Sequence, residues 1–213
     1  MPADPLAYTD SKTFTCTFTG VAVDAYEVQA DVTGVGVPVA VYYAGSYRDV
    51  LTVYDTDAGF VTGGGKFIYP GSEDRVNFGL VYTFTGKGKT TPRGNLLVMR
   101  HLENGDVCRA KSNGIGAPGV VGSDASFSGK GNYVCTTPEG SSYDGAGNIS
   151  ILGWVRDNGE PGASSTETPD LFWIRVVAPE SQLLMPMGVP ANAAPLIGGN
   201  IQVPHKTGSG GKK

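Results

Sequence analysis

The chain has 213 residues, of which 32 are glycine and 14 are proline, and only 17% carry a charge. This composition favours many short strands joined by turns, and 40% hydrophobic residues with a net charge of -4 argue against disorder. The mild acidity offers no basic surface for nucleic acid, and no apolar run has the length of a membrane span.

The first quarter of the chain looks like half of a β-sandwich. After a polar lead-in at residues 1–12 come four alternating or β-branched runs that end in glycine or aspartate: "TFTCTFTG", "YEVQADVTG", "PVAVYYAG" and "DVLTVYD". They predict four short strands within residues 13–54. An immunoglobulin-type sandwich needs about seven strands. We therefore interpret residues 13–54 as a partial immunoglobulin-like segment.

Strand signals continue through residues 55–206, with no pattern typical of a helix. The runs are "RVNFGLVYTFTG", "GNLLVMRHL", "ASFSGKGNYVC", "GNISILGWVRD", "DLFWIRVV" and "NIQVPH". Asn104-Gly105 predicts a hairpin turn, and the apolar "DLFWIRVV" predicts a strand buried on both faces. Residues 178–199 read as a long surface connection, and residues 207–213 as a flexible tail. The expected fold is all-β, an antiparallel β-sandwich or jelly-roll-like module behind the immunoglobulin-like segment.

Three consecutive glycines, Gly63, Gly64 and Gly65, stand between two strand-like runs in "VYDTDAGFVTGGGKF". One interpretation is a phosphate-binding loop, which requires a helix directly after the glycines. The following "KFIYPGSED" does not predict a helix, and "GKGKTT" further on lacks the first glycine of a phosphate-binding loop. We therefore expect structural glycines at a place where one backbone passes close to another.

The three cysteines are Cys16, Cys108 and Cys135, and none belongs to a Cys-x-x-Cys pair. With only two histidines in the chain, the sequence does not predict a zinc site. Cys108 and Cys135 lie in two strand-like runs of one region, which predicts a disulfide rather than two buried thiols. Cys16 is then free or paired with another chain. A disulfide places the protein outside the cytoplasm.

The sequence offers candidate residues for two small ligands, calcium and a glycan, and each of these residues also has an ordinary structural role. Oxygen-bearing side chains gather in two turns and are the candidates for calcium: Asp55, Asp57, Asp157, Asn158 and Glu160. The same residue types are common in turns for their local hydrogen bonds, so we expect no cofactor and keep calcium as the alternative. Tyr143, beside Asp144-Gly145, is the aromatic residue expected on the surface and the candidate glycan contact.

The sequence predicts no catalytic site. A nucleophilic hydrolase needs a base and an orienting acid beside its nucleophile, and the only histidines are His101 and His205. No Gly-x-Ser-x-Gly motif occurs, and His101 reads as a surface residue beside a turn. We therefore expect a protein without enzymatic activity.

Several blocks of the sequence resemble the post-COAP domain, a module of large secreted and surface proteins of bacteria and some archaea. The blocks are "VYDTDAGFVTGGGKF", "NFGLVYTFTGKGKTTPRGNLLV", "SFSGKGNYVC", "AGNISILGWVRDNGE", "DLFWIRV" and "LIGGNIQVPHK". In the second block the matching residues are Asn77, Phe78, Gly79, Val81, Gly86, Pro92, Gly94, Asn95 and Leu96. The cysteines are additions to that pattern. The resemblance implies an extracellular β-module with no known reaction and no catalytic residues to transfer.

In such proteins the domain follows immunoglobulin-like or hyalin-like repeats, which matches the half-sandwich in front. Four strands alone leave an open apolar face and an unpaired edge. The segment can pack on the following domain, pair with another copy, or accept a donated strand from a neighbour.

The first hypothesis for function is a cell-surface or matrix module for structure and adhesion. The alternatives are a pilus-like filament subunit joined by strand donation and a carbohydrate-binding module. Expected partners are proteins, including copies of the chain, and surface glycans.

Overall fold

Regular structure in the described residues consists of strands and two single 3-10 turns. The computed structural model describes residues 15–22, 24–32, 45–53, 61–85, 91–116, 119–159 and 168–203. The strands are β1 Asp24–Val32, β2 Gly45–Val53, β3 Val61–Ile68, β4 Arg75–Thr85, β5 Thr91–His101, β6 Val107–Ile115, β7 Gly119–Val121, β8 Asp124–Thr136, β9 Ser142–Arg156, β10 Leu171–Val177, β11 Leu183–Pro186, β12 Ala194–Pro195 and β13 Gly198–Gln202. The two turns are η1, Pro179–Ser181, and η2, Pro190–Asn192. The predicted all-β class is confirmed.

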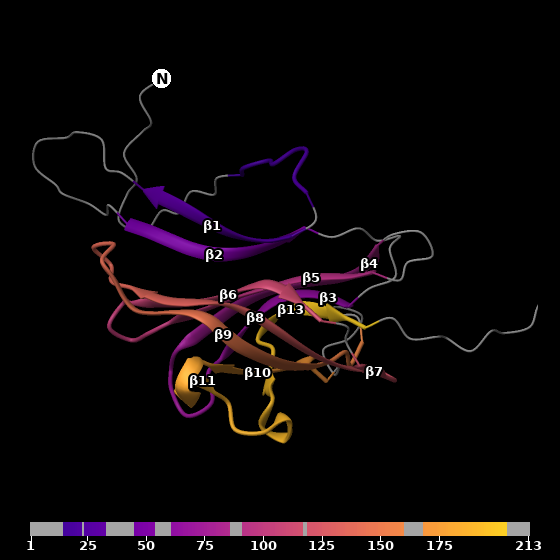
Figure 1. The fold of residues 1–213 in the computed structure, drawn as a ribbon. Coiled ribbons are helices and arrows are strands. Elements are labelled where there is room, and N and C mark those ends of the chain that lie inside the picture. Colours follow the sequence, from indigo (N-terminus) through magenta and orange to yellow (C-terminus); the bar gives the residue numbers. More distant parts are fainter. Residues whose placement is uncertain are drawn as a thin grey trace, which may run out of the picture.

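Eleven strands form one antiparallel sheet that curls over on itself (Figure 1). Its hydrogen-bonded order is β11-β10-β9-β8-β6-β5-β4-β3-β13, with β12 paired to β10 and β7 paired to β8. Curling brings the two halves of the sheet face to face, because each half has one apolar face to bury. This architecture agrees with the sandwich or jelly-roll-like fold expected from the sequence.

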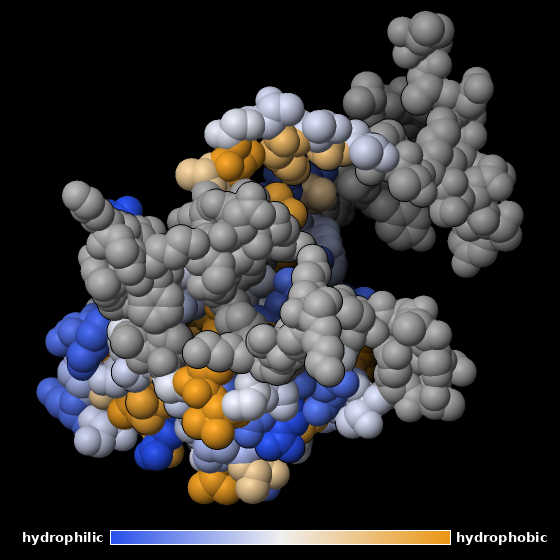
Figure 2. Space-filling model, turned by 90° about the vertical axis from the view of Figure 1, so that its right-hand side faces the viewer, coloured by the Kyte–Doolittle hydropathy of each residue, from blue (hydrophilic) through white to orange (hydrophobic). Residues whose placement is uncertain are grey.

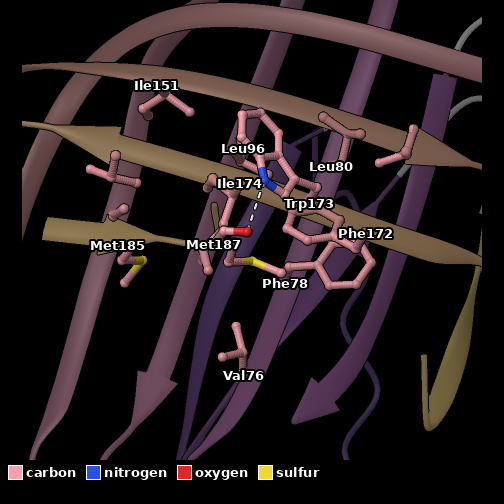
Figure 3. Packing of buried hydrophobic residues seen from close by; sticks show 14 of the residues in the cluster. Val76, Phe78, Leu80, Leu96, Ile151, Phe172, Trp173, Ile174, Met185 and Met187 are labelled. Carbon is pink, nitrogen blue, oxygen red and sulfur yellow. Dashed lines mark hydrogen bonds between the residues drawn. The ribbon is translucent and has the colours of Figure 1, made fainter. Parts of the chain in front are cut away.

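The core lies on the concave side of the curled sheet. The Phe172 ring of β10 is centred 5.4 Å from the Phe67 ring of β3 and 4.1 Å from the Phe78 ring of β4. These strands are remote from β10 in sheet order, so their contact depends on the curl. Figure 3 shows Phe78 beside Phe172, together with other buried side chains of both halves. Burying each such aromatic or aliphatic side chain stabilises the folded state by about 1.5–3 kcal/mol relative to leaving it in water.

The two ends of the sheet meet through the segment that carries β12 and β13. The Leu196 N–H donates to the peptide oxygen of Asp170 at the start of β10, at 2.9 Å. The next residue, Ile197, donates to the peptide oxygen of Lys66 in β3, at 2.8 Å. The buried carboxylate of Asp170 also accepts from the Ile201 N–H of β13, at 2.7 Å. Consecutive residues therefore fasten opposite ends of the curled sheet to each other.

Residues 178–199 are mostly exposed, as expected of a surface connection, but the expectation of a connection without strands is wrong. This stretch contains β11 and β12, which both pair with the free side of β10. Met185 and Met187 are buried in the core, and the Trp173 Nε1 donates to the Met187 peptide oxygen at 3.3 Å (Figure 3). Strands this short carry too few residues for an alternation pattern to be recognised, which explains the error.

The glycine triplet lies inside β3 and not in a turn between strands. Gly63 stands opposite Ile201 of β13, and Gly65 stands opposite Gly199. A Cβ at Gly65 would lie 2.6 Å from the Gly198 peptide oxygen, and one at Gly63 would lie 2.9 Å from the Asn200 oxygen. β13 therefore passes so close to β3 that side chains do not fit between them. The strand continues to Ile68, so no helix follows the triplet.

Replacing Gly65 by alanine should lower the free energy of unfolding by about 2–3 kcal/mol, because the new Cβ forces β13 away from β3. Urea denaturation followed by tryptophan fluorescence measures this change. Gly145→Ala is the matched control, since a Cβ there meets nothing within 4 Å. Equal stability of the two variants contradicts the steric role.

β1 and β2 form a separate two-stranded antiparallel sheet that lies on the outer side of the main sheet, against β4 and β5 (Figure 1). Of the three arrangements expected for residues 13–54, the structure has packing within one chain. The expected strand "TFTCTFTG" is wrong in its described part, because residues 15–20 belong to no strand. Most of "PVAVYYAG" lies outside the described residues. The described strands of this segment thus form a hairpin layered on the main sheet.

Candidate functional site

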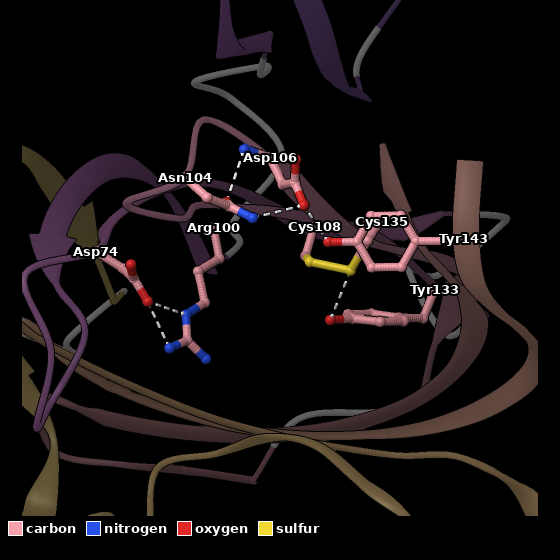
Figure 4. Close-up of a disulfide and its surroundings, with 8 residues drawn as sticks. All are labelled: Asp74, Arg100, Asn104, Asp106, Cys108, Tyr133, Cys135 and Tyr143. Atoms are coloured by element: carbon pink, nitrogen blue, oxygen red, sulfur yellow. Dashed lines mark hydrogen bonds and ion pairs between the residues drawn. A yellow bond between two sulfur atoms is a disulfide. The ribbon is translucent and has the colours of Figure 1, made fainter. Parts of the chain in front are cut away.

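The predicted disulfide is confirmed, and it joins the beginning of β6 to the end of β8 (Figure 4). Cys108 and Cys135 stand directly opposite each other in the strand register, and both are buried. The Tyr133 hydroxyl donates to the Cys135 Sγ at 3.3 Å, because a disulfide sulfur carries no proton to donate. The bond therefore sits in a shielded, hydrogen-bonded position inside the fold.

Tyr143, the predicted glycan contact, lies opposite Cys135 on β9. Its hydroxyl donates to the Asp106 carboxylate, which also accepts from the Asn104 side-chain amide at 2.9 Å. The hydrogen bond to Asp106 raises the pKa of Tyr143 to about 12. Its side chain is 36% exposed. The hydroxyl proton is engaged by Asp106, so Tyr143 can offer a sugar its ring and its hydroxyl oxygen as an acceptor, and the glycan contact stays a prediction.

An ion pair not predicted from the sequence joins the end of β5 to the residue before β4 (Figure 4). The Arg100 guanidinium binds the buried Asp74 carboxylate through Nε at 2.7 Å and Nη2 at 2.5 Å, and lies 3.8 Å above the Tyr69 ring. Arg100 shares the inward face of β5 with Leu96 and Val98. A charged residue at a position where the alternation requires an apolar one was the sequence feature that could have revealed a buried ion pair. The pairing neutralises the charge that an anionic ligand requires.

The calcium candidates within the described residues have structural partners. The Asp157 carboxylate accepts from Gly159 N–H at 3.0 Å and from Val203 N–H at 2.9 Å. The Asn158 side-chain amide donates to the Pro169 oxygen at 2.7 Å. These bonds tie the end of β9 to the end of β13 and to the start of β10.

The other calcium candidates, Asp55, Asp57 and Glu160, lie outside the described residues. Within the described residues, no three or more His, Cys, Asp and Glu side chains form a group that can hold a metal ion. Calcium binding stays a prediction.

The hairpin covers a small apolar patch on the outer face of β5. Leu97 and Met99 point away from the core, yet both are fully buried. Val50 of the hairpin and Val107 of β6 pack against them. The patch is separate from the main core, so the hairpin forms a second hydrophobic layer.

Two polar contacts also join the hairpin to the main sheet. The Arg109 Nη1 of β6 donates to the Glu27 carboxylate of β1 at 2.6 Å. The Asn77 side-chain amide of β4 donates to the Asp49 carboxylate of β2, and Asn77 is only 3% exposed. The acids belong to the hairpin and the donors belong to the main sheet. The sequence predicts neither contact, because partners so far apart in the chain leave no local pattern.

His101 lies under the hairpin and not freely on the surface. The Tyr47 ring of β2 stacks on it, with centroids 6.4 Å apart and planes 11° from parallel. The Arg75 guanidinium carbon lies 5.1 Å from the centre of the Tyr47 ring. Burial, and next the positive charge of Arg75, lowers the pKa of His101, although Asp49 acts in the opposite direction. The neutral form of His101 is therefore favoured where its ring lies against the hairpin.

Residues 15–22 precede β1 and belong to no strand or helix, and the backbone bends at Gly20, whose φ is 69°. Cys16 is an exposed free thiol, and the Phe18 side chain is 61% exposed. The described contact is a 3.0 Å hydrogen bond from the Tyr26 hydroxyl to the Ala22 peptide oxygen. In the space-filling view, the described residues at the level of the hairpin stand above the main body and expose both hydrophobic and hydrophilic groups (Figure 2). This part of the molecule is open to contact.

Comparison with known proteins does not assign the chain to a family. No family model matches it, and neither the curated proteins nor the solved structures contain a significant match. The resemblance to the post-COAP domain therefore stays a prediction. In the described part of the chain, no helix has the length and hydropathy required to cross a membrane.

Proposed function

We propose that this chain is a non-enzymatic extracellular β-module that gives structure to a cell surface or matrix and adheres to other proteins there. The observation that carries the proposal is the buried disulfide between Cys108 and Cys135. Disulfides persist in oxidising compartments and are rare in the cytoplasm. The bond cross-links adjacent strands of the main sheet, which suits a protein that has to keep its shape outside the cell.

The use of charged side chains supports a structural role. Arg100 pairs with Asp74, and Arg156 holds Asp124 through two hydrogen bonds of 2.7 and 2.8 Å. The Asp170 carboxylate binds peptide N–H groups that close the sheet. These charged side chains bind other parts of the same fold, so their role is to stabilise it.

Surface labelling of intact cells that produce the protein tests the extracellular proposal. A membrane-impermeant biotin reagent should label its lysines, and mass spectrometry without reduction should find Cys108 linked to Cys135. A lysed culture is the control for total labelling. A chain that is labelled only after lysis, with both thiols open to alkylation, contradicts the proposal.

The second candidate is a self-assembling subunit joined by strand donation. It is favoured by the exposure of residues 15–20, which belong to no strand although "TCTFT" alternates like one. Residues 198–202, in contrast, are already paired with β3 as strand β13. Light scattering after size-exclusion chromatography tests assembly. A single monomer at every concentration contradicts it.

A further inference from the structure

We propose that the β1–β2 hairpin also docks on the main sheet of a second copy, so that two chains exchange hairpins. The proposal rests on the self-assembling candidate function and identifies the exchanged unit as the hairpin. The partner is a second copy of this chain, and the contact surface is the outer face of β4, β5 and β6.

The hairpin is a unit that separates without breaking sheet hydrogen bonds. Its two strands pair with each other from Asp24 opposite Val53 to Val32 opposite Gly45, and they form a sheet of their own. The described residues contain no backbone hydrogen bond between this hairpin and the main sheet. Among the described residues, undocking therefore disrupts side-chain contacts and leaves the hydrogen bonds of both sheets intact.

The face of the main sheet beneath the hairpin is apolar, so its exposure to water is unfavourable. Leu97 and Met99 are fully buried on the outer face of β5, and removing the hairpin brings both into water. Exposed apolar side chains of this kind favour re-docking. Either the chain's own hairpin or an identical hairpin from a neighbour provides that cover.

The distribution of charge favours an identical hairpin, rather than an unrelated segment, as the partner of this sheet face. The hairpin contributes the carboxylates Glu27 and Asp49, whereas the main sheet contributes Arg109 and the Asn77 amide. Arg75 of the sheet adds a cation beside the Tyr47 ring of the hairpin. A hairpin from a second copy brings the same groups in the same positions, so every contact is reproduced.

The length of the connection to β3 sets how far the hairpin can reach. Residues 54–60 join Val53 to Val61, and eight peptide steps span at most about 28 Å. In an exchanged dimer both interfaces are kept, and the opposing cost is the loss of independent motion of two chains. A bias that favours docking between chains over docking within one chain should then produce dimers.

Two charge reversals, Glu27→Arg and Arg109→Glu, create that bias. In each single variant the hairpin and its own sheet carry like charges at this position. In a mixture, the arginine introduced into the hairpin of one variant meets the glutamate introduced into the sheet of the other variant. The unchanged Glu27 and Arg109 meet in the second interface of the same dimer. Both ion pairs return only in the mixed dimer with exchanged hairpins.

The experiment mixes the two purified variants at equal concentration, incubates them to equilibrium and counts species by native mass spectrometry. The mixed dimer should exceed each homodimer by about tenfold, beyond the twofold excess expected by chance, since it has two ion pairs where each homodimer has two like-charge contacts. The double variant Glu27→Arg/Arg109→Glu is the matched control. It restores the pair within one chain and should show no more dimer than the wild type.

The outcomes separate this inference from the wider self-assembly proposal. A statistical distribution of dimers, or a mixture that stays monomeric, overturns hairpin exchange. Wild-type oligomers that persist beside such a result leave self-assembly standing and assign it to another surface, such as residues 15–22.

Discussion

Asp170→Ala is expected to lower the free energy of unfolding by about 3–5 kcal/mol, because it removes two hydrogen bonds to a buried carboxylate. Asp170 is 6% exposed and accepts from Ile201 N–H at 2.7 Å and Asn158 N–H at 2.8 Å. Ile201 is fully buried, so its N–H group would be left without its present acceptor. Chemical denaturation by urea, followed through tryptophan fluorescence, measures the loss.

Two further variants make the Asp170 experiment specific. Asp170→Asn keeps one oxygen acceptor and turns the other position into a donor, so it should have an effect but a smaller one than alanine. Glu139→Ala removes an exposed carboxylate in a turn and should change stability by less than about 0.5 kcal/mol. A loss below about 1 kcal/mol in Asp170→Ala would falsify the role of this carboxylate in closing the sheet.

The double variant Cys108→Ala/Cys135→Ala should lose about 3–4 kcal/mol of stability. The disulfide spans 27 residues of sequence, and cross-linking a segment of this length removes about that much conformational freedom from the unfolded chain. Both side chains are also buried, so alanine leaves unfilled space in the core. Urea denaturation of the oxidised wild type and of the double variant gives the difference.

The third cysteine provides a matched control. Cys16 is exposed and free, so Cys16→Ser should unfold at the same urea concentration as the wild type. Wild-type protein treated with a reductant under unfolding conditions should behave like the double variant. If reduction leaves the midpoint unchanged, the disulfide does not support the fold to this extent.

The disulfide and the strand content could be predicted because their signals are local. Alternation of apolar and polar residues identifies a strand from a few neighbours, and "NYVC" and "DVCR" place each cysteine in such a run. Asn104-Gly105 marks the hairpin between β5 and β6 in the same way, since that turn requires backbone angles these residues favour. In each case the deciding residues are adjacent in the chain.

The candidate contacts were harder to predict because their partners are remote in sequence. Arg109 meets Glu27 and Asn77 meets Asp49 only after the hairpin lies on the main sheet. Tyr143 was correctly expected near the surface, but its bond to Asp106 depends on the pairing of β9 with β8. Residue type shows what a side chain can bind, and the fold decides which partner it reaches.

Local residue patterns were thus sufficient for the all-β class, most of the long strands and the choice of Cys108 and Cys135 as partners. The folded chain alone established that the glycine triplet belongs to β3, that residues 194–202 close the curled sheet and that the hairpin forms a second layer. The physical reason is that strand periodicity is a property of neighbouring residues. Strand order, closure and layering arise instead from the burial of apolar faces contributed by distant segments.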